Sequence, residues 1–172
     1  MEKIRITSGN LRGRTIKSPR SNLTHPMGAR EKLALFNMIA MELPGAMVLD
    51  AFAGSGALGI EALSRGAGGV VFVEKNTKVA RIIAENLGSL GLEGEIISSN
   101  ARSFESKKMF DIIIADPPYD NFNLNDIIYL TKYLKNGGVF VLSHPGATPV
   151  ISGLELTKSH KYAGATLSIF KK

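Results

Sequence analysis

Four consecutive residues, Asp116, Pro117, Pro118 and Tyr119, combine groups that could hold a planar amino group for chemistry. The Asp116 carboxylate can accept one N–H bond, and the backbone carbonyl of Pro117 can accept the other. The two prolines fix their φ angles and remove competing N–H donors, so this carbonyl stays aimed. Tyr119 could stack on a flat base. The stretch therefore suits methylation of an exocyclic amine on a nucleobase, whose nitrogen lone pair must be held in line with the methyl donor.

Asp116 does not have to be a strong base in this chemistry. The amine becomes acidic only as the methyl group arrives, so a nearby carboxylate stabilises the developing positive charge and can take or relay the proton. Two simpler interpretations stay open. Pro-Pro and Asp are ordinary turn residues and could merely end a strand, and Tyr119 could be a packing ring.

A second group of polar residues lies earlier in the chain. Asp50 ends an apolar run and is followed by a glycine-rich stretch, in which Gly54, Gly56 and Gly59 would let backbone N–H groups come close to a ligand. Glu74 ends the next apolar run, 24 residues after Asp50. A carboxylate at such a position can accept hydrogen bonds from both hydroxyls of a ribose.

The glycine spacing also fits the dinucleotide fingerprint Gly-x-Gly-x-x-Gly, which is a weak signal by itself. A carboxylate at the Asp50 position would repel a pyrophosphate, whereas it suits the ammonium group of a methionine moiety. The pattern therefore favours S-adenosylmethionine over NAD as the cofactor. The simpler alternative is that the glycines only allow a helix to pack tightly on a strand.

The elements that must position these residues alternate along the chain. Apolar runs at 46–52, 69–74, 94–100, 110–116 and 139–143 predict strands, and the segments 29–41, 56–67, 76–91 and 123–138 predict helices, the first from the spacing of Leu33, Phe36 and Ala40. Nearly unbroken apolar strands separated by amphipathic helices are typical of a doubly wound, Rossmann-like α/β fold with a mostly parallel sheet. Residues 154–172 predict a C-terminal antiparallel hairpin.

In a parallel sheet of this kind, ligands bind at the carboxyl ends of the strands, near the point where strand order reverses. Asp50, Glu74, Asn100 and Asp116 each follow or end one of the predicted strands. We therefore expect them to gather at one edge of the sheet. Phe52 and Lys75, which are close to the two carboxylates in sequence, are further predicted cofactor contacts.

The net charge of +6 is concentrated at one end of the chain. Residues 1–30 hold seven basic residues against Glu2 alone, and the remaining 142 residues balance. Residues 8–18 show strand-like alternation around Gly9-Asn10, which predicts a small β-hairpin. We expect two parts, a basic N-terminal appendage at 1–28 and a methyltransferase domain at 29–172. A basic segment attracts polyanions such as RNA, although a merely solvated basic face is the simpler alternative.

Other functional classes are disfavoured by composition. The chain has no cysteine, and its three histidines, His25, His144 and His160, lie far apart, so no metal site is predicted. The first residues carry charges where a signal peptide needs an apolar run, and no apolar stretch reaches membrane-spanning length. We expect a cytoplasmic protein without a membrane partner, and a monomer.

Several stretches resemble a known family. The segments "VLDAFAGSGALGIEALSRGA", "FVEKN" and "ADPPYD" resemble class I S-adenosylmethionine-dependent methyltransferases that act on amino groups. The segments "RITSGNLRGRTI", "HPMGAREKLALFNMI" and "KYAGATLSIFKK" are more closely similar to the bacterial 16S ribosomal RNA guanine-N2 methyltransferases, the RsmD family. The resemblance covers nearly the whole chain.

The resemblance implies a site for each part of the reaction. Asp50, Gly54, Gly56 and Glu74 would surround the cofactor, Asn100 and Ala101 would lie beside its adenine, and residues 116–119 would hold the guanine amino group. It also implies 16S rRNA or a small-subunit assembly intermediate as the substrate. The target base would have to leave its stack, and we expect Arg12, Arg14, Lys17 and Arg30 to bind the flanking phosphates.

Three rival functions can be separated from this one. An adenine-N6 methyltransferase would use the same cofactor loop and the same residues 116–119. A non-catalytic RNA-binding domain would explain the basic segment but not Asp116 or the acidic strand ends. An NAD-dependent reductase would explain the glycines and Glu74 but would leave residues 116–119 without a role.

Overall fold

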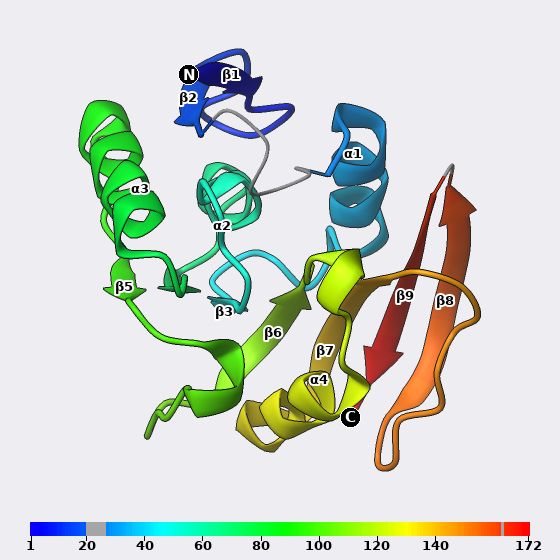
Figure 1. Cartoon of the computed structure of the whole chain (residues 1–172). Helices are drawn as coiled ribbons and strands as arrows, with labels where there is room; N and C mark the ends of the chain where they lie inside the picture. Colours follow the sequence, from blue (N-terminus) through cyan, green and yellow to red (C-terminus); the bar gives the residue numbers. More distant parts are fainter. Residues whose placement is uncertain (20–26, 163) are drawn as a thin grey trace.

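The computed structural model describes residues 1–19, 27–162 and 164–172 (Figure 1). Arg20 and His25 lie outside the described residues, as does part of the predicted N-terminal segment. A small two-stranded antiparallel sheet is formed by β1 (Glu2–Arg5) and β2 (Thr15–Ser18). The main sheet contains β3 (Met47–Asp50), β4 (Gly69–Val73), β5 (Glu95–Ile97), β6 (Phe110–Ala115), β7 (Leu134–His144), β8 (Glu155–Tyr162) and β9 (Ala165–Lys171).

The main sheet has the strand order β5-β4-β3-β6-β7-β9-β8. The strands from β5 to β7 are parallel, whereas β9 is antiparallel to both β7 and β8. The chain builds outward from β3 toward β5 and then crosses back to β6, so strand order reverses between β3 and β6. This arrangement confirms the predicted doubly wound α/β fold and its C-terminal antiparallel hairpin.

The described residues form the α-helices α1 (Ala29–Met38), α2 (Ala57–Ser64), α3 (Thr77–Leu90) and α4 (Leu124–Leu130). Short 3₁₀ turns occur at η1 (Ala101–Ser103), η2 (Tyr119–Asn121) and η3 (Thr131–Tyr133). Asn76 caps the start of α3, because its side chain accepts hydrogen bonds from the N–H groups of Lys78 and Val79. It ends at Gly91, which adopts the left-handed conformation with φ 68°.

Alternation along the central strands separates two hydrophobic cores. Val48, Ile112 and Ile114 belong to the core shared with α1, α2 and α3. Their neighbours Leu49 and Ile113 belong to the opposite core, which includes residues of η1 and α4. Figure 1 shows α4 on the other side of the sheet from α1, α2 and α3. Both sheet faces are therefore covered, which is why the central strands are apolar on consecutive positions.

Two predicted helices differ from the observed ones. The predicted helix 123–138 ends at Leu130, and the chain has already entered β7 at Leu134, opposite Phe110. The register then shifts, so that Ile112 pairs with Val139 and the intervening residues form an irregularity. The predicted helix 29–41 ends earlier, at Met38, so that Ala40 lies beyond it. Of the residues whose spacing predicted this helix, Phe36 is buried together with Lys32 and Leu35, whereas Leu33 is exposed.

The predicted hairpin is present, and its second strand, β2, lies within the predicted segment 8–18, whereas its first strand, β1, precedes that segment. Residues 6–14, which we expected to include a strand and a tight Gly-Asn turn, form the connection between β1 and β2. Gly9 has φ 82°, and a Cβ atom there would lie 1.8 Å from the carbonyl oxygen of Ser64. The N–H of Asn10 donates to this same carbonyl at 2.8 Å. The connection is therefore shaped by contact with the end of α2 rather than by hairpin geometry alone.

The hairpin is anchored to the domain through both apolar and charged contacts. Ile6 and Ile16 are buried in the core that α1, α2 and α3 share. The carboxylate of Glu61 on α2 accepts hydrogen bonds from the N–H and hydroxyl of Thr7, at 2.9 and 2.7 Å. Lys32 and Arg65 form ion pairs with the same carboxylate at 3.2 and 2.9 Å. One buried carboxylate thus joins the hairpin to α1 and α2.

Candidate functional site

The carboxyl ends of β3, β6 and β7 bring three polar side chains to one place. In the parallel register, Asp50 pairs with Ile114, and Ala115 pairs with Leu142. Asp116 and Ser143 are thus neighbours at the next position of β6 and β7. Strand alternation directs Asp50, Asp116 and Ser143 to the face that α1, α2 and α3 cover, because Val48, Ile114 and Val141 all belong to that core. The site lies where strand order reverses, as predicted.

Asp50 is buried, with 1% of its surface exposed. Its Oδ2 accepts the N–H of Gly59 at 2.9 Å, whereas its Oδ1 has no hydrogen-bond partner within the described part of the chain. Burial, together with repulsion from Asp116 and Glu74, raises the pKa of Asp50 to about 7 despite the hydrogen bond from Gly59. A buried carboxylate oxygen of this kind is stabilised by a cationic donor. The ammonium group of a methionine moiety fits this requirement.

Glu74 fixes the glycine-rich loop to the end of β4. Its Oε2 accepts the N–H of Gly54 at 2.9 Å, and its Oε1 accepts the N–H of Asn76 at 2.8 Å. Each carboxylate oxygen can accept a second hydrogen bond. The half-buried Glu74 side chain can therefore keep these backbone contacts and still accept the hydroxyls of a ribose.

The glycines of the loop serve the backbone and the packing. Gly54 and Gly56 have φ angles of 53° and 82°, which residues other than glycine rarely adopt. A Cβ atom on Gly59 would lie 2.2 Å from the ring of Phe72. The packing interpretation therefore applies to Gly59, and its N–H is already bonded to Asp50. Gly54 and Gly56 shape the turn that places the loop beside the strand ends.

The other predicted cofactor contacts are spread around this centre. Phe52 is half-buried and packs on the core shared with η1 and α4, whereas Lys75 is exposed. Asn100 is exposed and caps η1, since its side chain accepts the N–H of Arg102 at 3.4 Å. Ala101 is buried. Their contacts with a cofactor stay predictions.

Residues 116–118 connect the end of β6 to η2, which begins at Tyr119. Burial raises the pKa of Asp116 to about 6, and a hydrogen bond from Ser143 partly offsets this effect. Pro117 is buried, whereas Pro118 is exposed with φ −62° and ψ 128°. Tyr119 is 36% exposed and its hydroxyl is hydrogen-bonded to that of Ser143. The aromatic ring thus lies at the surface of the site while its hydroxyl is held inside.

Ser143 is the site residue that sequence reasoning missed. It is 1% exposed and is the last residue of the predicted apolar run 139–143, near the carboxyl end of β7. The rule that ligand-facing polar residues gather at the carboxyl ends of parallel strands points to this position but not to the contacts that Ser143 makes.

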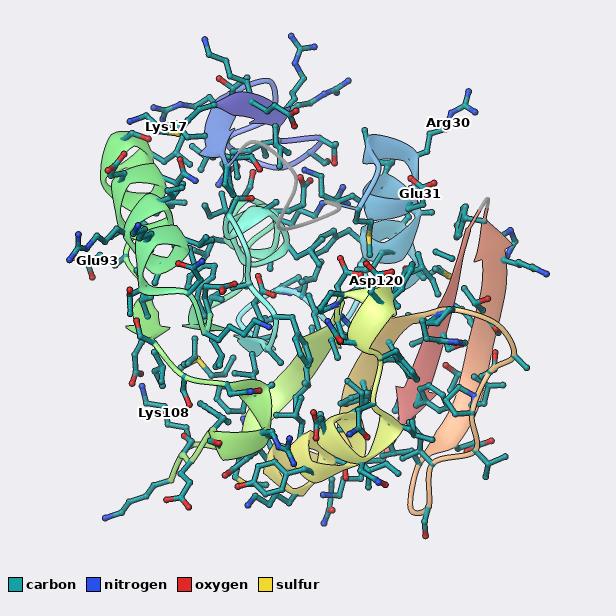
Figure 2. The ribbon with its side chains drawn as sticks, in the orientation of Figure 1. Lys17, Arg30, Glu31, Glu93, Lys108 and Asp120 are labelled. Atoms are coloured by element: carbon teal, nitrogen blue, oxygen red, sulfur yellow. The ribbon has the colours of Figure 1, made fainter. Side chains whose placement is uncertain are left out.

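The four basic residues predicted to bind phosphates differ in their surroundings. Arg12 is exposed in the connection between β1 and β2, and Arg14 is exposed while donating to the carbonyl oxygen of Ser89 at 2.9 Å. Lys17 forms an ion pair with Glu85 at 2.9 Å, so part of its charge is compensated. Figure 2 shows Arg30 on α1, apart from Lys17 on the hairpin and pointing outward. The structure therefore places one of the four on a different element from the other three.

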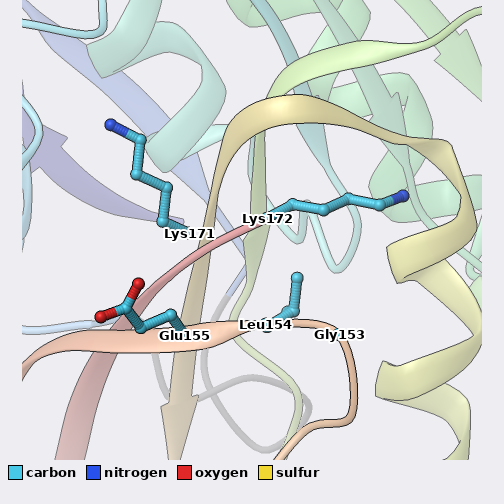
Figure 3. A pocket seen from close by; sticks show the side chains of 5 residues that line it. All are labelled: Gly153, Leu154, Glu155, Lys171 and Lys172. Carbon is cyan, nitrogen blue, oxygen red and sulfur yellow. The ribbon is translucent and has the colours of Figure 1, made fainter.

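Two surface hollows lie away from this centre. One is lined by Gly153, Leu154, Glu155, Lys171 and Lys172, and Figure 3 shows the side chains of Lys171 and Lys172 extending in different directions there. The second includes Asp111 and Lys135. Lys171 pairs with Val139 and Asp111 is the second residue of β6, so both hollows are distant from the carboxyl ends of the parallel strands. Neither contributes to the site.

Two classes of feature are absent from the residues that the structure describes. No group of three or more His, Cys, Asp or Glu side chains is placed to hold a metal ion among them. None of the described helices has the length and apolar character needed to cross a membrane.

Comparison with known proteins agrees with this geometry. The family model described as conserved hypothetical protein 95 matches residues 4–171. Ribosomal RNA small subunit methyltransferase D of Escherichia coli is 39% identical over 133 residues, which cover 76% of this chain and 67% of that protein. The structure of a candidate methyltransferase from Escherichia coli, yhhF, superimposes with a TM-score of 0.90 at 29% identity, covering 99% of this chain and 98% of that one.

A more distant structure shares the fold. The 16S rRNA N2 G1207 methyltransferase of Thermus thermophilus, in complex with S-adenosylmethionine and guanosine, has a TM-score of 0.75 at 22% identity. It covers 99% of this chain, which corresponds to 50% of that protein. The family model spans nearly all of the sequence. The chain therefore belongs to the conserved hypothetical protein 95 family, which is the RsmD family expected from its sequence.

Proposed function

We propose that this protein transfers a methyl group from S-adenosylmethionine to the exocyclic N2 amino group of a guanine in 16S ribosomal RNA. Family membership and the ribosomal RNA methyltransferase of Escherichia coli support this proposal. The observation that carries it is the meeting of buried Asp50, with its unpartnered Oδ1, and the Asp116 to Tyr119 stretch at adjacent ends of β3 and β6.

The cofactor half of the site is formed by Asp50 and Glu74. When bound, S-adenosylmethionine supplies a methyl group on a positively charged sulfur. Asp50 would bind the ammonium group of its methionine moiety, which removes the cost of an unpaired buried carboxylate oxygen. Glu74 would bind the ribose hydroxyls with the lone pairs that Gly54 and Asn76 leave free.

The acceptor half of the site holds the amine. Asp116 accepts one N–H of the guanine amino group and the carbonyl of Pro117 accepts the other, so the nitrogen lone pair faces the methyl carbon. Methyl transfer would form the N–CH₃ bond while the bond between the methyl carbon and sulfur breaks. The electron pair of the broken bond would stay on the sulfur, which gives S-adenosylhomocysteine as the product. The nitrogen then carries a positive charge, which Asp116 stabilises before the proton leaves to its carboxylate or to water.

Guanine is favoured over adenine by the family and by the neighbouring structures. The Thermus thermophilus protein that shares the fold is described with guanosine bound. A stacked or paired guanine cannot present its amino group in line with the methyl donor, so the base would be flipped out. An adenine N6 amino group would meet the same Asp116 and Pro117 acceptors, so adenine is the second candidate.

The substrate would be small-subunit rRNA or an assembly intermediate that contains it. The exposed Arg12 and Arg14 on the hairpin are the main candidates for binding phosphates next to the flipped base. Arg30 at the start of α1 would reach phosphates on another part of the RNA.

Methylation of small-subunit particles tests this proposal. The purified protein would be incubated with methyl-labelled S-adenosylmethionine and particles that lack the modification, and the RNA would be digested to nucleosides. We expect label in N2-methylguanosine from the wild type and none from Asp116→Ala. Label in N6-methyladenosine would replace guanine with adenine, and the absence of label from a protein that binds the cofactor would overturn the proposal.

A further inference from the structure

Ser143 joins two residues of the acceptor site through a single hydroxyl group. Its Oγ is hydrogen-bonded to the Tyr119 hydroxyl. It also lies beside Asp116, at the next position of the neighbouring strand, and its hydroxyl lowers the pKa of that carboxyl group. Ser143 is 1% exposed, so this hydroxyl is sheltered from solvent. A single buried serine is therefore bonded to Tyr119 and adjacent to Asp116, the two ends of the Asp116 to Tyr119 stretch.

The backbone fixes this meeting in two ways. The pairing of Ala115 with Leu142 makes Asp116 and Ser143 lateral neighbours, and strand alternation directs both to the same face. Tyr119 lies three residues beyond Asp116, after an extended Pro118 and at the start of η2. Its side chain can therefore extend back toward the end of β7.

The protons allow one fully satisfied arrangement. Ser143 has one O–H and can also accept a bond. Tyr119 donates its O–H to Ser143 Oγ, and Ser143 donates its O–H to the Asp116 carboxylate. This series of two hydrogen bonds ends on the strongest acceptor, because an ionised carboxylate binds a hydroxyl donor more tightly than a neutral oxygen does. If Ser143 instead donated its O–H to Tyr119, a lone pair of the Ser143 oxygen would face the ionised Asp116 carboxylate with no proton between them.

We propose that Ser143 is a positioning residue for the methyl transfer, holding the Tyr119 ring and the Asp116 carboxylate in one fixed geometry. The inference rests on the proposed function, in which Asp116 binds the amine and Tyr119 stacks on its ring. Ser143 acts through these two side chains. With its hydroxyl removed, the ring and the carboxylate would each gain rotational freedom, and the amine would less often be aligned for transfer.

The kinetic test compares Ser143→Ala with Tyr119→Phe, which breaks the same contact from the half-exposed side. We expect kcat to fall about tenfold in each, the effect of one hydrogen bond to or beside a charged group. The affinity for S-adenosylhomocysteine, measured by calorimetry, should stay within about twofold of the wild type. In the double variant the losses should be less than additive because both remove one contact. Ser143→Thr keeps the hydroxyl and should recover most of the rate.

A matched control separates positioning from a general loss of packing. Ser168 on β9 is fully buried and pairs with Leu142, and its hydroxyl is hydrogen-bonded to His144 Nε2 at 2.9 Å. Ser168→Ala removes a buried serine hydroxyl from the adjacent strand without touching Asp116 or Tyr119. We expect kcat to be unchanged in this variant. An equal loss of kcat in Ser143→Ala and Ser168→Ala would overturn the inference.

A second readout does not depend on the substrate. The hydrogen bond from Ser143 lowers the pKa of Asp116, so Ser143→Ala should raise it, as measured by ¹³C NMR of the Asp116 carboxyl carbon. Tyr119→Phe keeps the bond from Ser143 to Asp116 and should change this pKa less. Asp50 also lies near Asp116, and Glu31 lies near Tyr119, but both are the same in every variant.

The two readouts keep the inference distinct from the proposed function. An unchanged Asp116 titration in Ser143→Ala would contradict the role of Ser143, whatever RNA the protein methylates. Conversely, a wild type that methylates no guanosine would contradict the proposed function, while a raised Asp116 pKa in Ser143→Ala would still support the hydrogen-bond chain.

Discussion

At the scale of residues, the site consists of carboxylates that the fold has buried. Asp50 and Asp116 both have pKa values raised by burial, to about 7 and about 6. Carboxylates are seldom buried without partners because desolvation disfavours their charged form. Perturbed groups of this kind are frequent in functional sites. With pKa values of about 7 and about 6, Asp50 and Asp116 change charge close to neutral pH. Cofactor binding and the rate of methyl transfer should therefore both depend on pH.

Cofactor affinity should weaken in acid because Asp50 becomes protonated. A carboxyl group with a pKa of about 7 is increasingly neutral below pH 7 and then no longer attracts an ammonium group. We expect the affinity for S-adenosylmethionine to fall toward tenfold per pH unit below about pH 7. In Asp50→Asn, affinity should be weak at every pH and this dependence should disappear. Calorimetry from pH 5.5 to about 8.5 measures both, and an unchanged pH dependence in Asp50→Asn would contradict the assignment.

Whereas ionisation of Asp50 strengthens cofactor binding as pH rises, it should lower the stability of the cofactor-free protein. Its pKa is about 7 in the folded state and close to 3.8 in the unfolded state, so the folded state holds its proton more tightly. The free energy of unfolding should therefore decrease as pH rises from about 4 to 7. Without cofactor, Asp50→Asn should be more stable than the wild type at about pH 8 in urea denaturation. A less stable variant would show that the buried carboxylate is not strained in the free protein.

At the scale of elements, one ion cluster decides how the hairpin and α1 sit on the domain. Burial alone would raise the pKa of Glu61, but hydrogen bonds from Thr7 and the charges of Lys32 and Arg65 outweigh it and keep the pKa below its ordinary value. Lys32 is itself 2% exposed and donates to the carbonyl oxygen of Arg5 at 2.9 Å. A charged pair this deeply buried is costly to break from one side.

Removing the Glu61 charge should therefore destabilise the protein strongly. We expect Glu61→Gln to lower the free energy of unfolding by about 3–5 kcal/mol, because it leaves the Lys32 ammonium group buried without its counter-charge. Because the folded pKa of Glu61 is depressed, the wild type should lose this stabilisation progressively as pH falls below about 4.5, by at most about 1.4 kcal/mol per pH unit. Denaturation of both proteins at about pH 7 measures the effect of the substitution, and a series from about pH 5 down to about pH 2 measures the pH dependence.

Glu85→Gln is the matched control for this change. It removes the same charge from the pair with Lys17, in which both side chains are about half exposed. Exposed pairs contribute little, so the cost should stay below about 1 kcal/mol. Equal costs for the two variants would show that the Glu61 cluster is no more important than a surface pair.

At the scale of the whole molecule, the charge is divided between a basic hairpin and a neutral domain. Ile6 and Ile16 of the hairpin are buried in the main core, so its arginines are carried on a fixed support. Figure 1 shows the hairpin above α2 and α3, on the same side of the sheet as α1. Asp50 and Asp116 point to that face as well. RNA bound across the hairpin would therefore lie on the side of the sheet where the target base has to enter.

Neutralising Arg12 and Arg14 together should weaken RNA binding and make it less sensitive to salt. Each phosphate contact that is lost should reduce the slope of log affinity against log salt by roughly 0.7–0.9. The affinity for S-adenosylhomocysteine should not change. Filter binding to a fragment of small-subunit rRNA at several salt concentrations measures the slope.

Lys108→Ala combined with Lys135→Ala provides the control for this experiment. Both lysines form exposed ion pairs away from the hairpin, and Figure 2 shows Lys108 at the opposite end of the molecule from Lys17. The same number of positive charges is removed. An equal loss of RNA affinity in both pairs of variants would mean that overall charge, and not the hairpin, determines binding.

The sequence by itself determined the strands, the fold class and the three acidic positions at strand ends. These follow from local patterns, since apolar runs and glycine or proline signals each extend over a few residues. The expectation that these three acidic residues form one site follows from a general rule, that parallel strands present their carboxyl ends at the same edge of the sheet. Asp50, Glu74 and Asp116 could be named for that reason.

Only the tertiary structure decided which residues complete and support that site. Ser143 lies 24 residues after Tyr119, and Thr7 lies 54 residues before Glu61, so no local pattern reports either contact. Lys32 faces inward because a carboxylate from another helix stabilises it there, although hydrophobic periodicity does not predict a buried lysine. The connection between β1 and β2 is likewise shaped by contacts with the end of α2, and the start of β7 by its pairing with β6. Burial of polar groups depends on partners that folding brings together, and sequence spacing alone cannot identify them.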